Sequence, residues 1–176
     1  MRLKYYDLVS GSCEVSADFA KRLGFERVFR AGVDIKLVDS DSEKGTSCDN
    51  CIAYGTDKKR LTALAGSGAR GVAIKDMRAD GKLLSVMSEN NCILCIPTTV
   101  FTSRSGIERS KLFYRAGILL DTARKKHIRV SFISIADSKL HVCSYMQLIE
   151  IAKLVGADEQ FARNSISTVN GELLVK

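Results

Sequence analysis

The chain has 176 residues, of which 45% are hydrophobic and 27% are charged, and its net charge is +7. This length suits one domain spanning residues 1–176, and the composition excludes a largely disordered or fibrous chain. No apolar run approaches the ~20 residues that a membrane span needs, and the N-terminal residues lack the apolar core of a signal peptide, so we expect a cytoplasmic protein without a membrane partner.

The hydrophobic pattern predicts short strands that alternate with amphipathic helices, which is typical of βα units. In chain order, the expected elements are a strand at 5–9, a helix at 16–23, extended segments at 25–29 and 33–38, a helix at 57–65, a strand at 70–75, a helix at 82–89, a strand at 92–96, a helix at 105–126, a strand at 128–135, helices at 144–155 and 159–166, and a last segment at 169–175. Residues 105–108 have the spacing of a capping box, which predicts the start of the longest helix.

Two pairs of cysteines have the spacing of a zinc knuckle. Cys92 and Cys95 lie in an expected buried strand, where residues three apart point to opposite faces, so we interpret them as buried thiols. Cys48 and Cys51 lie in a polar loop at 42–50 and remain candidates for metal or redox chemistry.

Basic side chains are concentrated after residue 57. Residues 1–57 carry 8 Lys or Arg and 10 Asp or Glu, whereas residues 58–176 carry 19 and 10. Residues 98–133 contain eight basic residues and only two acidic ones. This surplus makes the predicted helix at 105–126 the best phosphate-binding candidate, because each cation that meets a phosphate releases counterions. A solubilising helix face is the alternative.

The C-terminal third carries a more specific pattern. Residues 134–138 read Ser-Ile-Ala-Asp-Ser, and residues 151–156 read Ile-Ala-Lys-Leu-Val-Gly. These segments resemble the S-G-A-x-S and L-A-x-x-L-G motifs of the p-thirty subunit family of archaeal and eukaryotic ribonuclease P. The Arg115-Ala116 pair, the run at 119–124 and the start of the first strand at 6–8 are also similar to that family.

The resemblance implies a TIM-barrel-like α/β fold related to the polymerase-and-histidinol-phosphatase (PHP) metal phosphoesterases. We expect a trimmed or open barrel, because a full barrel takes roughly 200 or more residues. Those enzymes bind metal through D-x-H-x-H, whereas Val9 and Gly11 replace both histidines after Asp7 here. We therefore expect no catalytic residue, no phosphoesterase metal site and no cofactor in this chain.

The resemblance implies a subunit that binds ribonuclease P RNA and precursor tRNA while the RNA removes the 5′ leader. Its implied partners are a small ferredoxin-like ribonuclease P protein subunit and other ribonuclease P proteins. The candidate RNA-binding residues are Lys58, Lys59, Arg60, Arg104, Arg109, Lys111, Arg115, Arg124, Lys125, Lys126 and Arg129. The candidate signature-loop residues are Ser134, Ala136, Ser138 and Ser144. This chain departs from the family at Ile135, where the motif has glycine, and at 142–145, where the motif has L-R-S-P.

Two alternatives remain open. A barrel enzyme would use a strand-end carboxylate such as Asp7, Asp34 or Asp76 on a small phosphorylated substrate held by the basic helix. A protein-interaction scaffold would bind no RNA at all.

Overall fold

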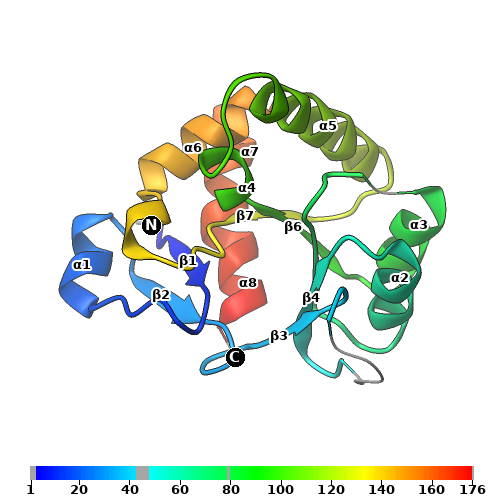
Figure 1. The fold of residues 1–176 in the computed structure, drawn as a ribbon, viewed down its shortest axis with the longest axis horizontal. Coiled ribbons are helices and arrows are strands. Elements are labelled where there is room, and N and C mark those ends of the chain that lie inside the picture. Colours follow the sequence, from blue (N-terminus) through cyan, green and yellow to red (C-terminus); the bar gives the residue numbers. More distant parts are fainter. Residues whose placement is uncertain (1–2, 43–47, 79, 176) are drawn as a thin grey trace.

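Parallel strands form the framework of the molecule. The computed structural model describes residues 3–42, 48–78 and 80–175. The strands within these ranges are β1 (Tyr6–Val9), β2 (Arg27–Arg30), β3 (Lys36–Asp39), β4 (Cys51–Gly55), β5 (Gly71–Ile74), β6 (Ile93–Pro97) and β7 (Val130–Ile133). The helices are α1 (Ala17–Arg22), α2 (Lys58–Gly66), α3 (Gly81–Glu89), α4 (Thr99–Thr102), α5 (Gly106–Lys125), α6 (Tyr145–Leu154), α7 (Glu159–Asn164) and α8 (Asn170–Leu174), with a 3-10 turn at Lys139–His141 and a π-helical turn at Ser165–Val169. Helices α1, α2, α3 and α5 lie outside the strands (Figure 1).

The strands form an open barrel. Strands β3 to β7 pair in chain order, and β1 pairs with β2, with every pair parallel. The two ladders meet beyond β7, where the Ile135 amide donates to the Leu8 carbonyl over 2.7 Å and the Ser10 amide donates to the Ala136 carbonyl over 2.8 Å. Residues 31–35 join β2 to β3 without a helix, and no ladder pairs these two strands in the described part of the chain. The α/β architecture with a parallel sheet is confirmed, and the barrel is not closed because this link is too short for a helical crossover.

Apolar side chains cover both faces of the curved sheet. The helices pack against the outer face through buried residues such as Leu61 of α2, Leu83 of α3 and Leu120 of α5. The inner face joins strand residues to the C-terminal helix, with Leu8 and Leu173 in one cluster. Buried parallel sheets need cover on both sides, and here α8 supplies the inner cover.

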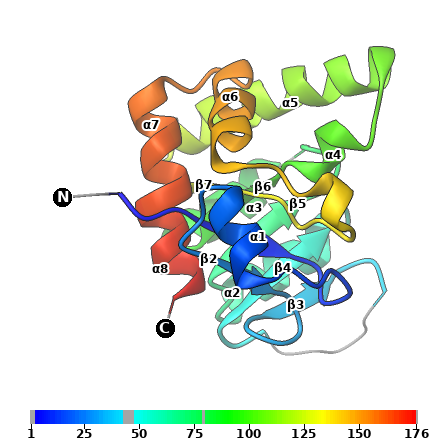
Figure 2. The ribbon, with the colours of Figure 1, turned by 90° about the vertical axis from the view of Figure 1, so that its left-hand side faces the viewer.

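The last three helical elements form one continuous segment beside the strands (Figure 2). The segment at 169–175, for which the sequence predicts no element type, is therefore mainly helical. Glu172 of α8 accepts a hydrogen bond from Arg70 at its carbonyl and pairs with Arg129 through its carboxylate. Arg70 and Arg129 immediately precede β5 and β7, so α8 covers the amino ends of the strands.

Side-chain caps fix most of the predicted helix starts. Asp57 and Asp158 accept hydrogen bonds from the amides three residues on, as an N-cap should. Ser144 and Gln147 form a complete capping box at the start of α6. The capping box expected at the start of α5 is wrong, because Ser105 makes no side-chain cap bond. Gly106 has a φ of 54°, which takes the chain out of the geometry that this cap requires.

The region between residues 42 and 55 differs from the sequence prediction. Residues 43–47 of the expected loop lie outside the described residues. Cys48 and Cys51 are fully buried and paired as a disulfide, and Cys51 begins strand β4, which the sequence pattern did not predict. Cys92 and Cys95 are buried free thiols that belong to the outer and inner cores respectively, as predicted. The described residues contain no group of three or more side chains arranged to hold a metal ion.

The expected strand at 128–135 is shorter in the structure, and the short helix α4 was not predicted. Among the described residues, no helix has both the length and the apolar character to cross a membrane.

Candidate functional site

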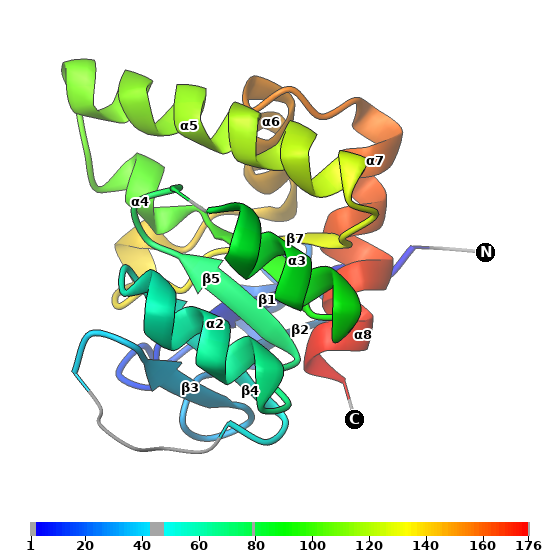
Figure 3. The ribbon, with the colours of Figure 1, turned by 90° about the vertical axis from the view of Figure 1, so that its right-hand side faces the viewer.

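A cavity of about 660 Å³ opens at the carboxyl ends of the strands. Its lining comes from the segments that follow β1, β4, β5, β6 and β7, together with α4 and the first half of α5. The arrowheads of β3 and β5 point toward the side on which α4 and the start of α5 lie (Figure 3). In α/β folds the carboxyl ends of the strands are the usual place for ligand sites. We refer to this hollow as the strand-end cavity.

Helices α4 and α5 form one wall of the strand-end cavity. The rings of Phe101 and Phe113 stack with their centroids 4.4 Å apart, which fixes α4 against α5. The Thr99 hydroxyl donates to the Ser134 carbonyl over 2.8 Å and thereby fixes α4 to the end of β7. This packing places Arg104 and Arg115 in the lining.

Arg104 and Arg115 form no hydrogen bond or ion pair through their side chains within the described part of the chain. The neighbouring Glu108 pairs with Lys111 over 2.9 Å. The hydrogen bond and charge of Lys111, with smaller effects from Arg115 and Arg104, lower the pKa of Glu108. The carboxylate thus has its own cation, and both arginines keep their donors available for a ligand.

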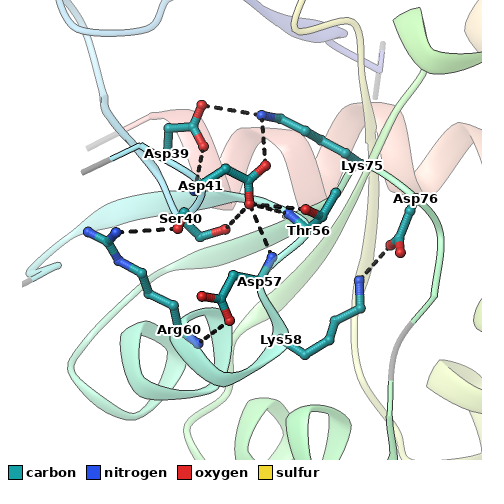
Figure 4. A network of polar contacts seen from close by, with 9 residues as sticks. All are labelled: Asp39, Ser40, Asp41, Thr56, Asp57, Lys58, Arg60, Lys75 and Asp76. Atoms are coloured by element: carbon teal, nitrogen blue, oxygen red, sulfur yellow. Dashed lines mark hydrogen bonds and ion pairs between the residues drawn. The ribbon is translucent and has the colours of Figure 1, made fainter. Parts of the chain in front are cut away.

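A polar network braces the opposite wall (Figure 4). Oδ1 of Asp41 accepts hydrogen bonds from the Thr56 amide over 2.8 Å and the Asp57 amide over 3.1 Å, and Oδ2 pairs with Lys75. Burial opposes ionisation of Asp41, but these bonds prevail and hold its pKa far below the usual range. Lys75 also pairs with Asp39 and lies 4.3 Å from the centroid of the Tyr54 ring. The sequence did not single out Asp41 or Lys75, although each stands just beyond a strand.

The three predicted RNA-binding cations at residues 58–60 differ in their contacts. Lys58 pairs with Asp76, and Arg60 donates to the Ser40 carbonyl over 3.3 Å. Both side chains thereby connect neighbouring strand ends. Lys59 is exposed and has no hydrogen bond or ion pair with the described residues.

The predicted basic helix does not present its cations as one patch. Helix α5 has 20 residues, so its ends lie about 30 Å apart. Arg124, Lys126 and Arg129 lie at the C-terminal end or just beyond it and hold other elements. Arg124 lies 4.3 Å from the Phe161 ring centroid, Lys126 donates to the Ser85 hydroxyl over 3.0 Å, and Arg129 pairs with Glu172. Among the predicted cations of the 98–133 region, Arg104, Arg109, Arg115 and Lys125 make no hydrogen bond or ion pair through their side chains with the described residues.

The outward face of α5 carries apolar side chains between its cations. Ile107, Tyr114 and Ile118 are 74%, 72% and 51% exposed. Their spacing of seven and then four residues places them on one face of a helix. The sequence pattern does not predict this exposed apolar face, because the same helix also carries the buried residues Ala116, Leu119, Leu120 and Ala123.

Two of the four signature-loop residues lie in the seam between β1 and β7. Ser134 and Ala136 are fully buried there, while Ser138 and Ser144 precede the 3-10 turn and α6 as N-cap residues. Ile135 has a φ of 47°, in the left-handed region that glycine favours and that a β-branched residue rarely adopts. The backbone here has the conformation that the glycine of the resembled motif suits, although this chain has isoleucine.

The three strand-end carboxylates that the sequence offers as catalytic groups have different environments. Asp34 pairs with Arg27 and Asp76 pairs with Lys58. Asp7 is fully buried, and its Oδ1 accepts from the amides of Leu8 and Ser134. Burial raises the pKa of Asp7 to about 7, against the lowering effect of these hydrogen bonds.

Comparisons with known proteins support the fold. No family model and no curated protein sequence matches the chain. Solved structures do match. A chain in the cryo-EM structure of archaeal ribonuclease P with mature tRNA has a TM-score of 0.71 and 14% identity, covering 96% of this chain and 80% of that one. The A. niger ochratoxinase has a TM-score of 0.56 and 11% identity, covering 97% of this chain and 54% of its own.

A prolidase complexed with N-methylphosphonate-L-proline has a TM-score of 0.54 and 13% identity, covering 70% of this chain and 33% of its own. The chain thus spans about half of the ochratoxinase and a third of the prolidase. At these identities the likeness establishes a common α/β framework.

Proposed function

We propose that the chain is a protein subunit of ribonuclease P, which binds ribonuclease P RNA and precursor tRNA and supports the RNA-catalysed removal of the 5′ leader. The observation that carries this proposal is the fold likeness over 96% of this chain to a chain of archaeal ribonuclease P. The proposed setting is the cytoplasm. A small ferredoxin-like subunit and other ribonuclease P proteins are the proposed protein partners.

The charge distribution supports an RNA partner. Residues 58–176 carry 19 basic and 10 acidic side chains. Lys59, Arg109 and Lys125 are exposed, form no hydrogen bonds or ion pairs through their side chains with the described residues, and lie outside the lining of the strand-end cavity. Cations of this kind contribute salt-dependent phosphate contacts that position an RNA without reading its sequence.

The outward face of α5 adds an aromatic surface to these cations. Tyr114 is exposed between Lys111 and Arg115. An unstacked RNA base packs on such a ring, and stacking contributes about 1–3 kcal/mol per base. The combination of cations and an exposed aromatic ring therefore suits an RNA partner better than a protein partner whose surface has mixed charge.

Binding of the purified chain to ribonuclease P RNA across a salt series tests the proposal. The test variant carries Lys59→Ala, Arg109→Ala and Lys125→Ala. The matched control carries Lys21→Ala, Arg22→Ala and Lys82→Ala, which removes the same charge from exposed sites on α1 and α3. We expect steep salt dependence for the native chain and a slope reduced by roughly 2 in the test variant alone.

Two results would contradict the proposal. The first is the absence of RNA binding at low salt. The second is an equal loss in both variants, because net charge rather than the named cations would then explain the affinity.

A further inference from the structure

We propose that the strand-end cavity is a separate binding site for one 5′-phosphorylated nucleotide, either free or at the end of an RNA. This inference goes beyond the ribonuclease P role, because a free nucleotide would satisfy the site without any RNA. It rests on the size, the charge layout and the apolar lining of the cavity.

The cavity has room for a small ligand. Its volume of about 660 Å³ lies within the roughly 300–1,000 Å³ of small-molecule sites. One nucleotide fits this space, whereas an RNA helix does not. The cavity therefore differs in kind from the exposed cations that we assign to RNA phosphates.

The α4–α5 wall provides for the phosphate. Arg104 and Arg115 both line the cavity, and their side chains form no hydrogen bond or ion pair with the residues that the structure describes. A guanidinium offers a planar fork of donors that matches phosphate oxygens, and bonds between charged groups are stronger than neutral ones. Glu108 between them is already paired with Lys111, so it does not neutralise both arginines.

The wall opposite α4 and α5, at the strand ends, offers hydrogen-bond acceptors for the hydroxyl and amine donors of a ligand. Asp76 and Asp137 line this side. Their Oδ1 atoms are bonded to Lys58 and His141, and a carboxylate can accept further hydrogen bonds through its second oxygen. Ser10 adds a hydroxyl. A ribose and a base carry donors of this kind, and a carboxylate that receives ribose hydroxyls is an established arrangement in α/β nucleotide sites.

The balance of charges selects against a bare polyanion. The lining contains Lys75, Arg104, Arg115 and His141 together with three acidic residues, Asp76, Glu108 and Asp137. Each carboxylate already has a partner, since Asp76 pairs with Lys58, Glu108 with Lys111 and Asp137 with His141. A phosphate ion alone would meet the arginines but use none of the remaining carboxylate acceptors. A ligand with a phosphate at one end and hydrogen-bond donors at the other uses both walls.

Apolar side chains complete the match. Leu37, Val100, Leu112 and Ile135 line the cavity. They offer a surface for the flat face of a base or the carbons of a ribose. Small-molecule sites commonly combine such a lining with a few placed polar groups.

Calorimetric titration of the full chain with 5′-AMP tests the inference, with adenosine and inorganic phosphate as control ligands. We expect saturable binding of 5′-AMP and affinity at least about tenfold weaker for each control, because each lacks one half of the ligand. A short RNA with a 5′-phosphate should compete with 5′-AMP, and the same RNA with a 5′-hydroxyl should compete more weakly if the site takes RNA ends. Competition by neither RNA would assign the site to free nucleotides.

Matched variants locate the site. Arg104→Ala with Arg115→Ala should weaken 5′-AMP binding about tenfold or more, while Lys59→Ala with Lys125→Ala, which removes equal charge outside the cavity, should leave it unchanged. Circular dichroism spectra that coincide with those of the native chain establish that both variants are folded. No saturable binding of 5′-AMP, equal binding of adenosine, or an equal loss in both variants would each overturn the inference.

The result is separable from the proposed function. RNA binding that depends on Lys59, Arg109 and Lys125, without 5′-AMP binding, would leave the ribonuclease P role standing and remove the nucleotide site. Binding of 5′-AMP without any RNA binding would do the reverse.

Discussion

The backbone amide of Ser134 donates a 2.7 Å hydrogen bond to Oδ1 of Asp7 and thereby joins the end of β7 to the middle of β1. Both residues are fully buried, and neither Oδ2 of Asp7 nor the Ser134 hydroxyl has a hydrogen-bond partner among the described residues. A carboxyl group in this position is better accommodated neutral than charged. The joint between the two ladders of the open barrel therefore depends on the ionisation of one side chain.

Asp7→Asn should remove a pH dependence from folding. The pKa of Asp7 is raised in the folded chain from 3.8 to about 7, so the protonated form stabilises the fold at low pH and that stabilisation is lost as pH rises from about 4 to 7. The loss is up to about 4 kcal/mol, since each pKa unit corresponds to about 1.4 kcal/mol. Urea unfolding between these pH values should show a smaller decline for Asp7→Asn, with greater stability than the native chain at alkaline pH.

The control for this measurement is Asp121→Asn, a substitution at an exposed position on α5. It should follow the native pH profile. A native profile that rises between pH 4 and 7, or one that Asp7→Asn leaves intact, would show that Asp7 is not the group responsible.

Asn170→Ala should destabilise the fold strongly. The Asn170 amide accepts from the Ser131 hydroxyl over 2.6 Å and donates to the carbonyls of Tyr6 and Phe132 over 2.8 and 2.9 Å. The bonds to Ser131 and Phe132 are buried, and the bond to Tyr6 is partly buried. Its removal leaves buried polar groups of β1 and β7 unpaired, at a cost of about 2–4 kcal/mol in the free energy of unfolding. Denaturant titration measures this difference.

Asn164→Ala provides the comparison, because Asn164 is exposed in the same continuous helical segment. Its effect should stay within about 0.5 kcal/mol. Asn→Ala raises helix propensity, so propensity cannot account for a loss. Similar losses for both variants would therefore show that the buried hydrogen bonds of Asn170 do not set the cost.

The helices were predictable because their signals are local. Asp57, Ser144 and Asp158 cap helices within three residues of themselves, and the sequence carries that information directly. Strand β4 was missed because Cys51 was assigned to a polar loop, whereas the structure buries it at the start of a strand. Burial of a short strand depends on packing that no local pattern reports.

The candidate site was predicted only in part, for the same reason. The surplus of cations near α5 is visible in the sequence, but which of them are free is decided by distant residues. Arg124 packs on Phe161, and Arg129 pairs with Glu172, 43 residues further on. The grouping of Arg104 and Arg115 with strand ends required the topology of the sheet.

At residue 135 we expect the usual order of stability between glycine and alanine variants to be reversed. Ile135→Ala and Ile135→Gly both remove most of a buried side chain, but only glycine is unstrained at a φ of 47°. At most positions glycine is less stable than alanine by about 0.5–1 kcal/mol, whereas a left-handed conformation costs other residues about 1–2 kcal/mol. We therefore expect Ile135→Gly to be at least as stable as Ile135→Ala in urea unfolding. A clear advantage for alanine would indicate that residue 135 is not left-handed in solution.

The disulfide predicts a count of reactive thiols. The chain has six cysteines, of which Cys48 and Cys51 are paired and Cys13, Cys92, Cys95 and Cys143 are free and buried. Titration with a thiol reagent should find four thiols in the unfolded, unreduced chain and six after reduction. The folded chain should react slowly, because burial also raises the pKa values of the free thiols. Six thiols in unfolded protein that was purified and handled without reductant would contradict the pairing.

The central proposal is that this chain assists an RNA catalyst, and cleavage of precursor tRNA at limiting Mg²⁺ tests it most directly. Protein cations replace part of the screening that Mg²⁺ provides between RNA helices, so ribonuclease P RNA should cleave faster when the chain and a small ferredoxin-like subunit are added together than with that subunit alone. The Lys59→Ala, Arg109→Ala, Lys125→Ala variant should give less acceleration than the charge-matched variant on α1 and α3. A rate unchanged by the chain, or leader removal by the chain without RNA, would contradict the account.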